Sequence, residues 1–275
     1  MALTPLDLLP PLRDVIATYD LMARKSLGQH FLCDLTITRK IAEHAGELSG
    51  CTVYEIGPGP GGLTRALVAS GAKRIIAIEK DRRCIVALSD VVRASDGRLE
   101  VIEGDALAID LLKLARRPRA VVANLPYNIG TELLIKWLRQ IDGFQSLTLM
   151  FQKEVADRLT AAPGSKIYGR LSVIAQFCCN VKQVMNLPAG AFTPPPKVDS
   201  TVVRLTPRAD RPEDVRFEDI ERVTAAGFGQ RRKMLRSSLK SLGGEGLLTR
   251  AGIDPTLRAE NLSLTDFENL ARLIP

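Results

Sequence analysis

Short apolar runs separated by polar stretches recur along the first three quarters of the chain and predict a layered α/β fold. Five runs have the length of buried strands and lie at 52–56, 75–78, 99–102, 120–123 and 147–151. A helical period follows the first run at 63–68, which favours parallel strands joined by crossovers. Two more apolar runs, around 178–184 and 201–205, predict an antiparallel hairpin at one sheet edge. We expect seven strands, six parallel and one reversed.

Both ends of the chain show helical patterns. One begins at Pro11 and runs to about Tyr19. The stretch 207–214 is rich in charge and proline, which is typical of a linker, and only helical periods follow it. We therefore predict two domains, an α/β domain over 1–207 with an N-terminal helical arm and a small all-helical domain over 208–275.

A glycine-rich turn, Gly57-Pro58-Gly59-Pro60-Gly61-Gly62, follows the first predicted strand. Glycines let the backbone turn sharply and approach a ligand, and the helix that begins beyond them supplies free N–H groups. The spacing differs from the GxGxxG of pyrophosphate binders, and two prolines remove amides that would bind phosphates. The turn favours a ligand without a diphosphate.

Two carboxylates follow the next strands. Glu79 ends the run at 75–78, about twenty residues after the glycines, where an acidic side chain binds ribose hydroxyls. Asp105 follows the run at 99–102, where a carboxylate can accept a hydrogen bond from an adenine amino group. Each acid alone is equally compatible with a solvated charge at a strand end. Their succession favours a site for an adenine nucleoside.

The tetrapeptide Asn124-Leu125-Pro126-Tyr127 follows the run at 120–123, at the sheet edge where open α/β folds bind ligands. It supplies an amide, a backbone carbonyl held out by proline and an aromatic ring, which suit a flat amine. Alone, it is more typical of a strand followed by a Pro-Tyr turn. Together with the glycines and the two carboxylates, it indicates an S-adenosylmethionine (SAM) site that faces an amine-methylating pocket.

Composition narrows the class of protein. Hydrophobic residues make up 45% and charged residues 25%, as in ordinary globular proteins, and we expect neither a membrane span nor a signal peptide. The five cysteines lack CxxC spacing and there are only two histidines. We therefore expect no disulfide, no zinc and no other metal, and a cytoplasmic location.

The chain is basic, with a net charge of +7, which suggests a polyanionic partner. The segment 230–240 carries five positive charges and no negative one. A helix over this segment would align Arg232, Arg236 and Lys240 on one face. Such a face is either solvated or bound to phosphates, and the repulsion between its charges favours the second alternative.

The motifs together resemble those of the ribosomal RNA adenine N6-dimethyltransferases, especially the small-subunit (16S) type. The resemblance begins near Leu12 and reaches the C-terminus. One departure is His30, where many members of the family have Asn, so a side-chain contact with SAM is lost there while a backbone contact survives. The blocks that carry the resemblance are 25–32, 55–59, 79–81, 104–106, 124–128, 152–156, 168–172 and 192–198.

The resemblance implies an α/β class I SAM-dependent methyltransferase with a Rossmann-like seven-stranded sheet and a small C-terminal all-helical domain. The product of the cofactor is S-adenosylhomocysteine (SAH). The substrate would be two adjacent adenosines in the 3′-terminal hairpin of 16S rRNA in the immature 30S subunit, and the enzyme a monomer. The Asn124 oxygen and the Leu125 carbonyl would each accept an N6–H bond. Tyr127 and Phe192 would stack on the two faces of the base; the alternative for Phe192 is core packing.

The implied ligand contacts complete the expected site. The cofactor contacts are Gln29, His30, Leu32, Gly57, Gly59, Glu79, Lys80, Asp105, Ala106 and Asn124. The expected RNA contacts are Arg24, Lys25, Lys197, Arg231, Arg232, Lys233 and Arg236.

Three other functions are compatible with parts of this pattern. A 23S rRNA adenine methyltransferase of the antibiotic-resistance type shares nearly all the SAM motifs. A DNA adenine methyltransferase usually has two prolines in the tetrapeptide, which makes it a poorer match. An RNA-binding ribosome-assembly factor with dispensable catalysis belongs to a different class, although the intact Asn124 and Tyr127 argue against a dead enzyme.

Overall fold

A computed structural model describes residues 4–22 and 28–274. The chain divides into two compact units. The first comprises Met1–Lys153 and Lys182–Thr206, and the second comprises Glu154–Val181 and Pro207–Pro275. A boundary was expected near residue 207, but the segment 154–181 was expected in the first domain. It belongs to the second unit because its helix α8 (Arg170–Cys178) packs against α9 (Phe217–Gly229) and α12 (Leu264–Leu273).

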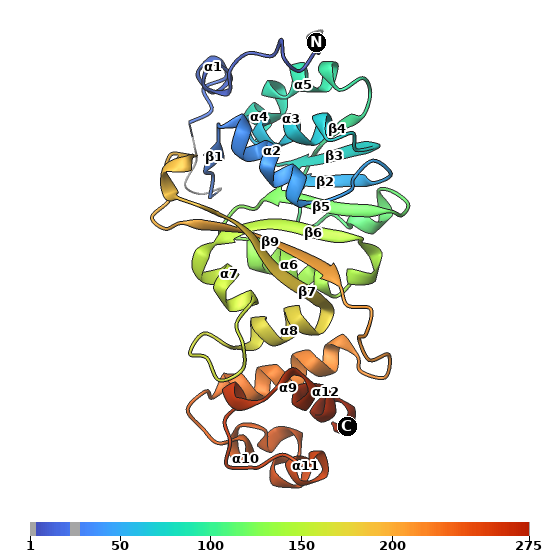
Figure 1. Ribbon diagram of the computed structural model, residues 1–275, viewed down its shortest axis with the longest axis vertical. Coiled ribbons are helices and arrows are strands. Elements are labelled where there is room, and N and C mark those ends of the chain that lie inside the picture. Colours follow the sequence, from blue (N-terminus) through green and yellow to red (C-terminus); the bar gives the residue numbers. More distant parts are fainter. Residues whose placement is uncertain (1–3, 23–27, 275) are drawn as a thin grey trace. The chain divides into compact units, whose positions relative to one another are not determined.

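A seven-stranded sheet has the order β4-β3-β2-β5-β6-β9-β7 (Figure 1). Strands β2 to β6 are parallel, and β9 runs antiparallel to β6, as the apolar runs predicted. The strands are β2 (Thr52–Ile56), β3 (Arg74–Glu79), β4 (Leu99–Glu103), β5 (Arg119–Asn124), β6 (Ser146–Gln152), β7 (Cys179–Leu187) and β9 (Ser200–Pro207).

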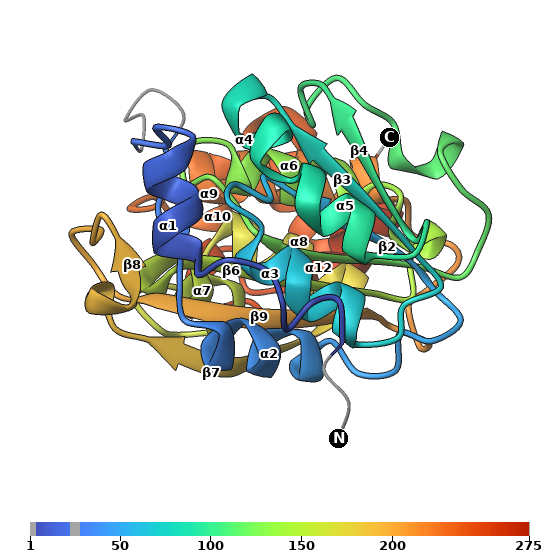
Figure 2. The same ribbon diagram turned by 90° about the horizontal axis from the view of Figure 1, so that it is seen from above.

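Helices and short 3₁₀ turns connect the strands of the first unit. Figure 2 shows α2 and α3 side by side, and the contacts between them agree. The helices are α1 (Leu12–Thr18), α2 (Leu35–His44), α3 (Gly62–Ala69), α4 (Arg82–Ala87), α5 (Ser89–Ala94) and α6 (Gly130–Leu138). The 3₁₀ turns are η2 (Leu111–Lys113), η3 (Ile141–Gly143) and η4 (Ala189–Ala191).

Two segments far apart in the sequence form a small second sheet. Strand β1 (Phe31–Leu32) pairs antiparallel with β8 (Phe192–Thr193). The backbone of β1 also comes close to α3. A side chain at Gly62 would not fit there, since its Cβ would lie only 2.5 Å from the Leu32 carbonyl oxygen. Gly61, just before the helix, has φ +92°, a conformation that glycine adopts without strain. The two glycines that end the Gly-rich turn therefore allow a sharp turn and a close contact with β1.

The second unit is helical apart from its ends of β7 and β9, and its described residues after 207 form helices and turns, as predicted. It contains α7 (Lys153–Leu159), whose first residue belongs to the first unit, together with α8, α9, α10 (Leu235–Ser238), α11 (Gly244–Ala251) and α12, and the 3₁₀ turns η5 (Lys240–Leu242) and η6 (Ala259–Asn261). The rings of Phe228 and Phe267 stack in its core with centroids 5.6 Å apart. No helix among the residues described is long and apolar enough to cross a membrane.

The expected continuous helix over 230–240 is wrong. Helix α9 ends at Gly229, residues 230–234 form turns, and α10 begins only at Leu235. The reason is a tertiary one: the Arg231 guanidinium binds the Glu260 carboxylate at 2.8 Å and donates to the backbone carbonyls of Lys166 and Tyr168. These contacts hold residue 231 in a turn, and the turn interrupts the helix that the sequence pattern predicted.

Candidate functional site

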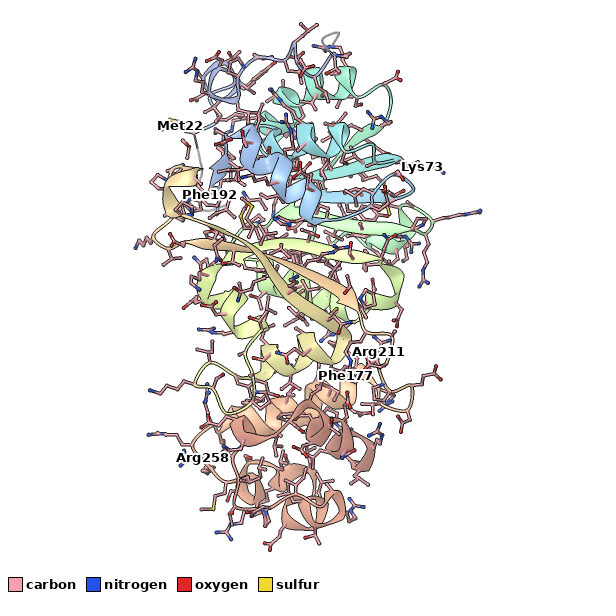
Figure 3. The ribbon with its side chains drawn as sticks, viewed as in Figure 1. Met22, Lys73, Phe177, Phe192, Arg211 and Arg258 are labelled. Atoms are coloured by element: carbon pink, nitrogen blue, oxygen red, sulfur yellow. The ribbon has the colours of Figure 1, made fainter. Side chains whose placement is uncertain are left out.

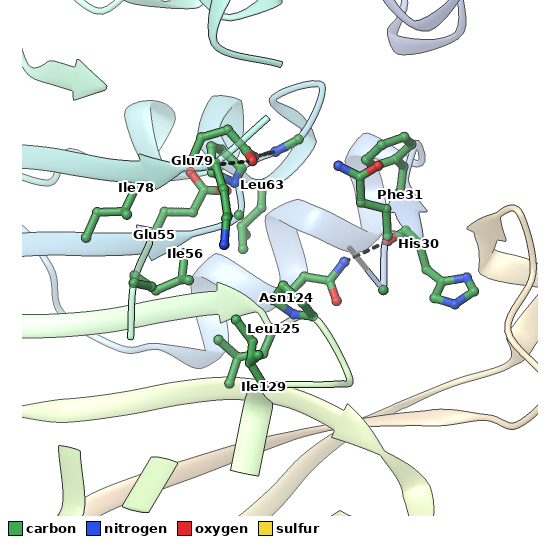
Figure 4. Close-up of a pocket in the computed structure, with 18 of the residues that line it drawn as sticks. His30, Phe31, Glu55, Ile56, Leu63, Ile78, Glu79, Asn124, Leu125 and Ile129 are labelled. Carbon is green, nitrogen blue, oxygen red and sulfur yellow. Dashed lines mark hydrogen bonds between the residues drawn. The ribbon is translucent and has the colours of Figure 1, made fainter. Parts of the chain in front are cut away.

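A pocket lies at the carboxyl ends of β2, β3, β4 and β5, where the parallel strands bring their last residues together (Figure 4). The glycine turn 57–60, the strand ends and the tetrapeptide all line it. So do all ten residues expected to contact the cofactor, which are Gln29, His30, Leu32, Gly57, Gly59, Glu79, Lys80, Asp105, Ala106 and Asn124. Leu125 and Tyr127 also face it.

The Glu79 carboxylate connects the glycine turn with the end of β3. Its Oε2 accepts from the Gly59 N–H at 3.1 Å, and its Oε1 accepts from the N–H groups of Lys80 and Asp81, both at 2.8 Å. The side chain is nearly buried, and this burial raises its pKa although the three N–H donors act in the opposite direction. Glu79 therefore shapes the pocket as well as facing it.

Glu55 is a pocket residue that the sequence reasoning missed. It belongs to β2, whose five residues are all buried, and its own exposure is 1%. Within the described chain its Oε2 has no hydrogen-bond partner. Burial, reinforced by the nearby Glu79 charge, raises its pKa to about 8. The available signal was its position just before the glycine turn, in a strand with no exposed face.

Asp105 stands at the more open side of the pocket. Its Oδ2 accepts from the Lys80 ammonium at 2.8 Å, and its Oδ1 accepts from the Leu107 N–H at 2.9 Å. The bond from Lys80, followed by that from Leu107, lowers the pKa of Asp105. The carboxylate is therefore ionised at neutral pH and remains an acceptor at the pocket wall.

An ion pair beside the pocket ties Gln29 to the N-terminal arm. The Asp81 carboxylate, almost fully buried, accepts from Gln29 Nε2 at 3.3 Å and from the Arg83 guanidinium at 2.7 Å. Arg83 also donates to the carbonyls of Asp20 and Met22. The arm that carries α1 and the block around Gln29 are thus both bound to the end of β3.

The Asn124 amide has a defined orientation. Its Nδ2 donates to the His30 carbonyl at 3.0 Å, drawn as a dashed line in Figure 4. No hydrogen bond from the described residues reaches its Oδ1, so the oxygen is the group available in the pocket. His30 thus supplies a backbone carbonyl to the tetrapeptide.

Tyr127 is half-buried and bound at both its hydroxyl and its ring. The hydroxyl lies 2.6 Å from Ser200 Oγ, and burial raises the pKa of the phenol. The ring stacks against His30, with centroids 5.3 Å apart and an angle of 29° between the planes. His30 in turn places its Nδ1 2.8 Å from the Pro194 carbonyl, an acceptor, so Nδ1 carries the hydrogen.

The expected stacking role of Phe192 is not supported. Its exposure is only 3%, it does not line the pocket, and it belongs to a core cluster with Leu32, Leu187 and Val202. Figure 3 shows it close to β1, its partner strand. The pairing of β8 with β1 turns the ring inward, so core packing, the alternative considered from the sequence, describes Phe192 in this structure.

The expected RNA contacts fall into three groups. Arg24 and Lys25 lie outside the described residues. Lys197 is exposed in the first unit, and Arg232, Lys233 and Arg236 are exposed in the second, where their side chains have no ion-pair partner among the residues described. Arg231 differs because its guanidinium is bound to Glu260 and to two backbone carbonyls, which indicates a structural role.

Metal ligands do not gather in the described part of the chain. No group of three or more His, Cys, Asp or Glu side chains there has an arrangement that would hold an ion.

The fold is shared with solved structures. A dimethyladenosine transferase from Plasmodium falciparum matches with a TM-score of 0.74 and 29% sequence identity, covering 88% of this chain and 96% of that one. The 23S rRNA methyltransferase ErmE matches with a TM-score of 0.69 and 26% identity, covering 88% and 99%. The class of protein is therefore a class I methyltransferase fold with a helical C-terminal part.

Sequence comparison identifies the family. The family model described as ribosomal RNA adenine dimethylase matches residues 21–274. A protein from Rhodospirillum rubrum is 59% identical over 272 residues, covering 98% of this chain and 94% of that protein. One from Paramagnetospirillum magneticum is 59% identical over 267 residues, covering 97% and 95%. Both are named ribosomal RNA small subunit methyltransferase A. The chain belongs to the ribosomal RNA adenine dimethylase family, as its motifs implied.

The buried Glu55 makes a prediction about stability. A carboxyl whose folded-state pKa is raised to about 8 stabilises the folded state fully below its unfolded value near 4.5. The free energy of unfolding then falls between pH 4.5, where the carboxyl ionises in the unfolded chain, and pH 8, where it ionises in the folded one. The Glu55→Gln variant stays neutral, so it should gain stability over the wild type by something on the order of 4 kcal/mol between pH 5 and pH 9.

Urea unfolding measures this difference through the fluorescence of Trp137, the single tryptophan of the chain, which is buried in the first unit. Glu47→Gln serves as a control whose stability difference from the wild type should stay nearly constant over this pH range, because the Ser49 N–H lowers the pKa of Glu47 and the carboxyl is largely ionised in both the folded and the unfolded chain above pH 5. If wild type and Glu55→Gln change with pH in parallel, Glu55 is ionised at no unusual cost.

Proposed function

We propose that this chain transfers methyl groups from SAM to the N6 atoms of two adjacent adenosines in the 3′-terminal hairpin of 16S rRNA, within the immature 30S subunit. The observation that carries the proposal is the orientation of Asn124, whose Nδ2 is bound to the His30 carbonyl while its Oδ1 remains available in the pocket. The small-subunit names of relatives that are 59% identical support 16S rRNA over 23S rRNA. We further propose that the chain works as a monomer in the cytoplasm.

The pocket residues fit SAM. Glu79 would bind the ribose hydroxyls and Asp105 the adenine amino group, at the strand ends where both carboxylates lie. The buried Oε2 of Glu55 has no hydrogen-bond partner among the described residues, as expected where a ligand brings a donor. The prolines at 58 and 60 offer no N–H for a diphosphate, in agreement with a nucleoside ligand. Bound SAM supplies an electrophilic methyl group on a sulfonium sulfur.

The tetrapeptide would act on the target base. The exocyclic nitrogen of adenine is a poor nucleophile because its lone pair is delocalised into the ring. The Asn124 Oδ1 and the Leu125 carbonyl would each accept one N6–H bond, which favours a tetrahedral nitrogen with a localised lone pair. No strong base is needed, since a methylated ammonium loses its proton readily. Tyr127 would lie against one face of the base.

The two units would have different functions, cofactor binding in the first and RNA binding in the second. The first unit contains all the residues that line the pocket proposed for SAM. The second would bind rRNA phosphates through Arg232, Lys233 and Arg236, which are exposed and have no ion-pair partner among the described residues. Lys197 of the first unit would add a further phosphate contact.

The choice of substrate is the direct test of this function. Purified protein with labelled SAM is offered immature 30S particles, 23S rRNA and duplex DNA in parallel. We expect label in 16S rRNA as N6,N6-dimethyladenosine, close to two residues per particle, and background levels elsewhere. Labelling of 23S rRNA alone would support the antibiotic-resistance alternative. Binding to 30S particles without any label would support an assembly factor.

Replacement of Asn124 tests the chemistry of the pocket. The Asn124→Ala variant loses the acceptor proposed for the transition state, so its rate should fall by about 100- to 1,000-fold at saturating SAM and saturating 30S. Some loss of SAM affinity is also expected, because the bond to the His30 carbonyl disappears. Single-turnover kinetics separate the two effects. A near wild-type rate would mean that Asn124 only ends a strand.

Salt dependence tests the basic surface. Neutralising Arg232, Lys233 and Arg236 to Gln should weaken 30S binding and reduce the slope of log affinity against log salt by up to about 2–3, one contact per cation. SAH affinity should stay unchanged. Arg231 is left intact because its contacts are structural.

The control removes three exposed cations of the first unit, Lys40, Lys73 and Arg116, and therefore changes the net charge equally. If both variants lower the slope by the same amount, net charge rather than this surface governs RNA binding.

A further inference from the structure

Three backbone carbonyls of the loop that follows β4 converge on one side chain. Lys136 Nζ, on α6, donates to the carbonyl oxygens of Ala106 at 3.1 Å, Leu107 at 2.7 Å and Ile109 at 2.7 Å. An ammonium has three N–H donors, so each of them has one acceptor here.

The same loop forms the wall of the SAM pocket. Gly104, Asp105 and Ala106 line the pocket. The loop is tightly turned, because the N–H groups of residues 107, 108 and 109 all donate to Asp105, the first to its carboxylate and the others to its carbonyl. The amides of the loop are therefore bound to Asp105, while its carbonyls are bound to Lys136.

This division makes the loop depend on a cation. Carbonyl oxygens that point at one place repel each other, and a half-buried carbonyl without a donor is costly. Without the ammonium, the carbonyls of residues 106, 107 and 109 would turn towards water. Asp105 and Ala106 would move with them, because they belong to the same turn.

Helix α6 joins this loop to the tetrapeptide. Its first turn is set by the Pro126 carbonyl, which accepts from the N–H groups of Ile129 and Gly130. Ile129 lines the pocket as well. Helix α6, which begins three residues after the tetrapeptide, thus carries at residue 136 the cation that binds the Asp105 loop.

We propose that Lys136 is a positioning residue for SAM: it holds the Asp105 loop in the conformation in which the pocket wall binds the adenosine part of SAM. The inference rests on the proposed function, since it assumes that the pocket binds SAM. Lys136 itself need not touch the ligand. Its removal should therefore reduce affinity for adenosine-containing ligands more than the rate at saturation.

The experiment uses the full chain with Lys136→Met, which keeps an unbranched side chain up to the fourth atom and removes the ammonium. Calorimetry measures SAH and methylthioadenosine, the second of which lacks the amino-acid part of SAM. We expect both to bind about tenfold more weakly. This is roughly the loss expected if the hydrogen bond between the Asp105 carboxylate and the adenine amino group is weakened. The KM for SAM should rise similarly, with kcat within about threefold. Lys113→Met, an exposed lysine on η2, is the matched control and should bind as the wild type does.

A double-mutant cycle distinguishes positioning from a general structural effect. In an Asp105→Asn background, Lys136→Met should add less than about a threefold loss, because the group that it positions is already impaired. An undiminished tenfold loss in that background would overturn the inference. So would wild-type SAH affinity in a Lys136→Met variant that is folded by Trp137 fluorescence. If the Met variant does not fold, Lys136→Gln takes its place, with the same expected loss and the same contrary result.

The wild-type titration separates this inference from the function on which it rests. A wild-type chain that binds neither SAH nor SAM contradicts the proposed function, and the inference with it. A wild-type chain that binds SAH while the Lys136 variants bind equally well contradicts the inference alone.

Discussion

A buried carboxylate needs hydrogen-bond donors, and the way in which Glu79 obtains them organises the whole pocket. Its three donors are backbone N–H groups, one from the glycine turn after β2 and two from the start of the segment after β3. Two adjacent strand ends are thereby fixed around one acceptor. The backbone of Gly59 reaches the carboxylate with φ +55°, a conformation that most other residues rarely adopt. The ligand site, the glycine turn and the acidic strand end are consequences of the same interaction.

The second constraint is the pairing of β1 with β8, which brings residues about 160 positions apart into one small sheet. Through it, the block around His30 reaches the tetrapeptide: the His30 carbonyl orients the Asn124 amide, and its ring stacks on Tyr127. The same pairing buries Phe192 in the core. A substitution at position 30 therefore acts on the tetrapeptide and on the 192–198 loop together, since the His30 ring also bonds to Pro194.

Cationic side chains have two different kinds of surroundings in this molecule. Arg231 and Lys136 each donate hydrogen bonds to backbone carbonyls and thereby stabilise a turn. Arg232 and Lys233, the immediate neighbours of Arg231, are exposed without such partners among the described residues. A run of like charges is therefore not one functional unit. Neighbouring arginines in a basic segment can differ completely in role, and the difference depends on which acceptors the fold brings near them.

The sequence by itself determined the strands, the parallel order that their spacing implies, and the residues at the strand ends. These depend on local periodicity and on the rule that parallel strands end at one edge, so ten expected cofactor residues line one pocket. Only the tertiary structure decided the inward turn of Phe192, the end of α9 at Gly229, the structural role of Arg231 and the place of 154–181 in the second unit. It also decided that Glu55 is buried, with one carboxylate oxygen that no described residue reaches by a hydrogen bond. Each of these depends on which distant segment of the chain supplies the neighbouring atoms. A local sequence pattern does not indicate which segment that is.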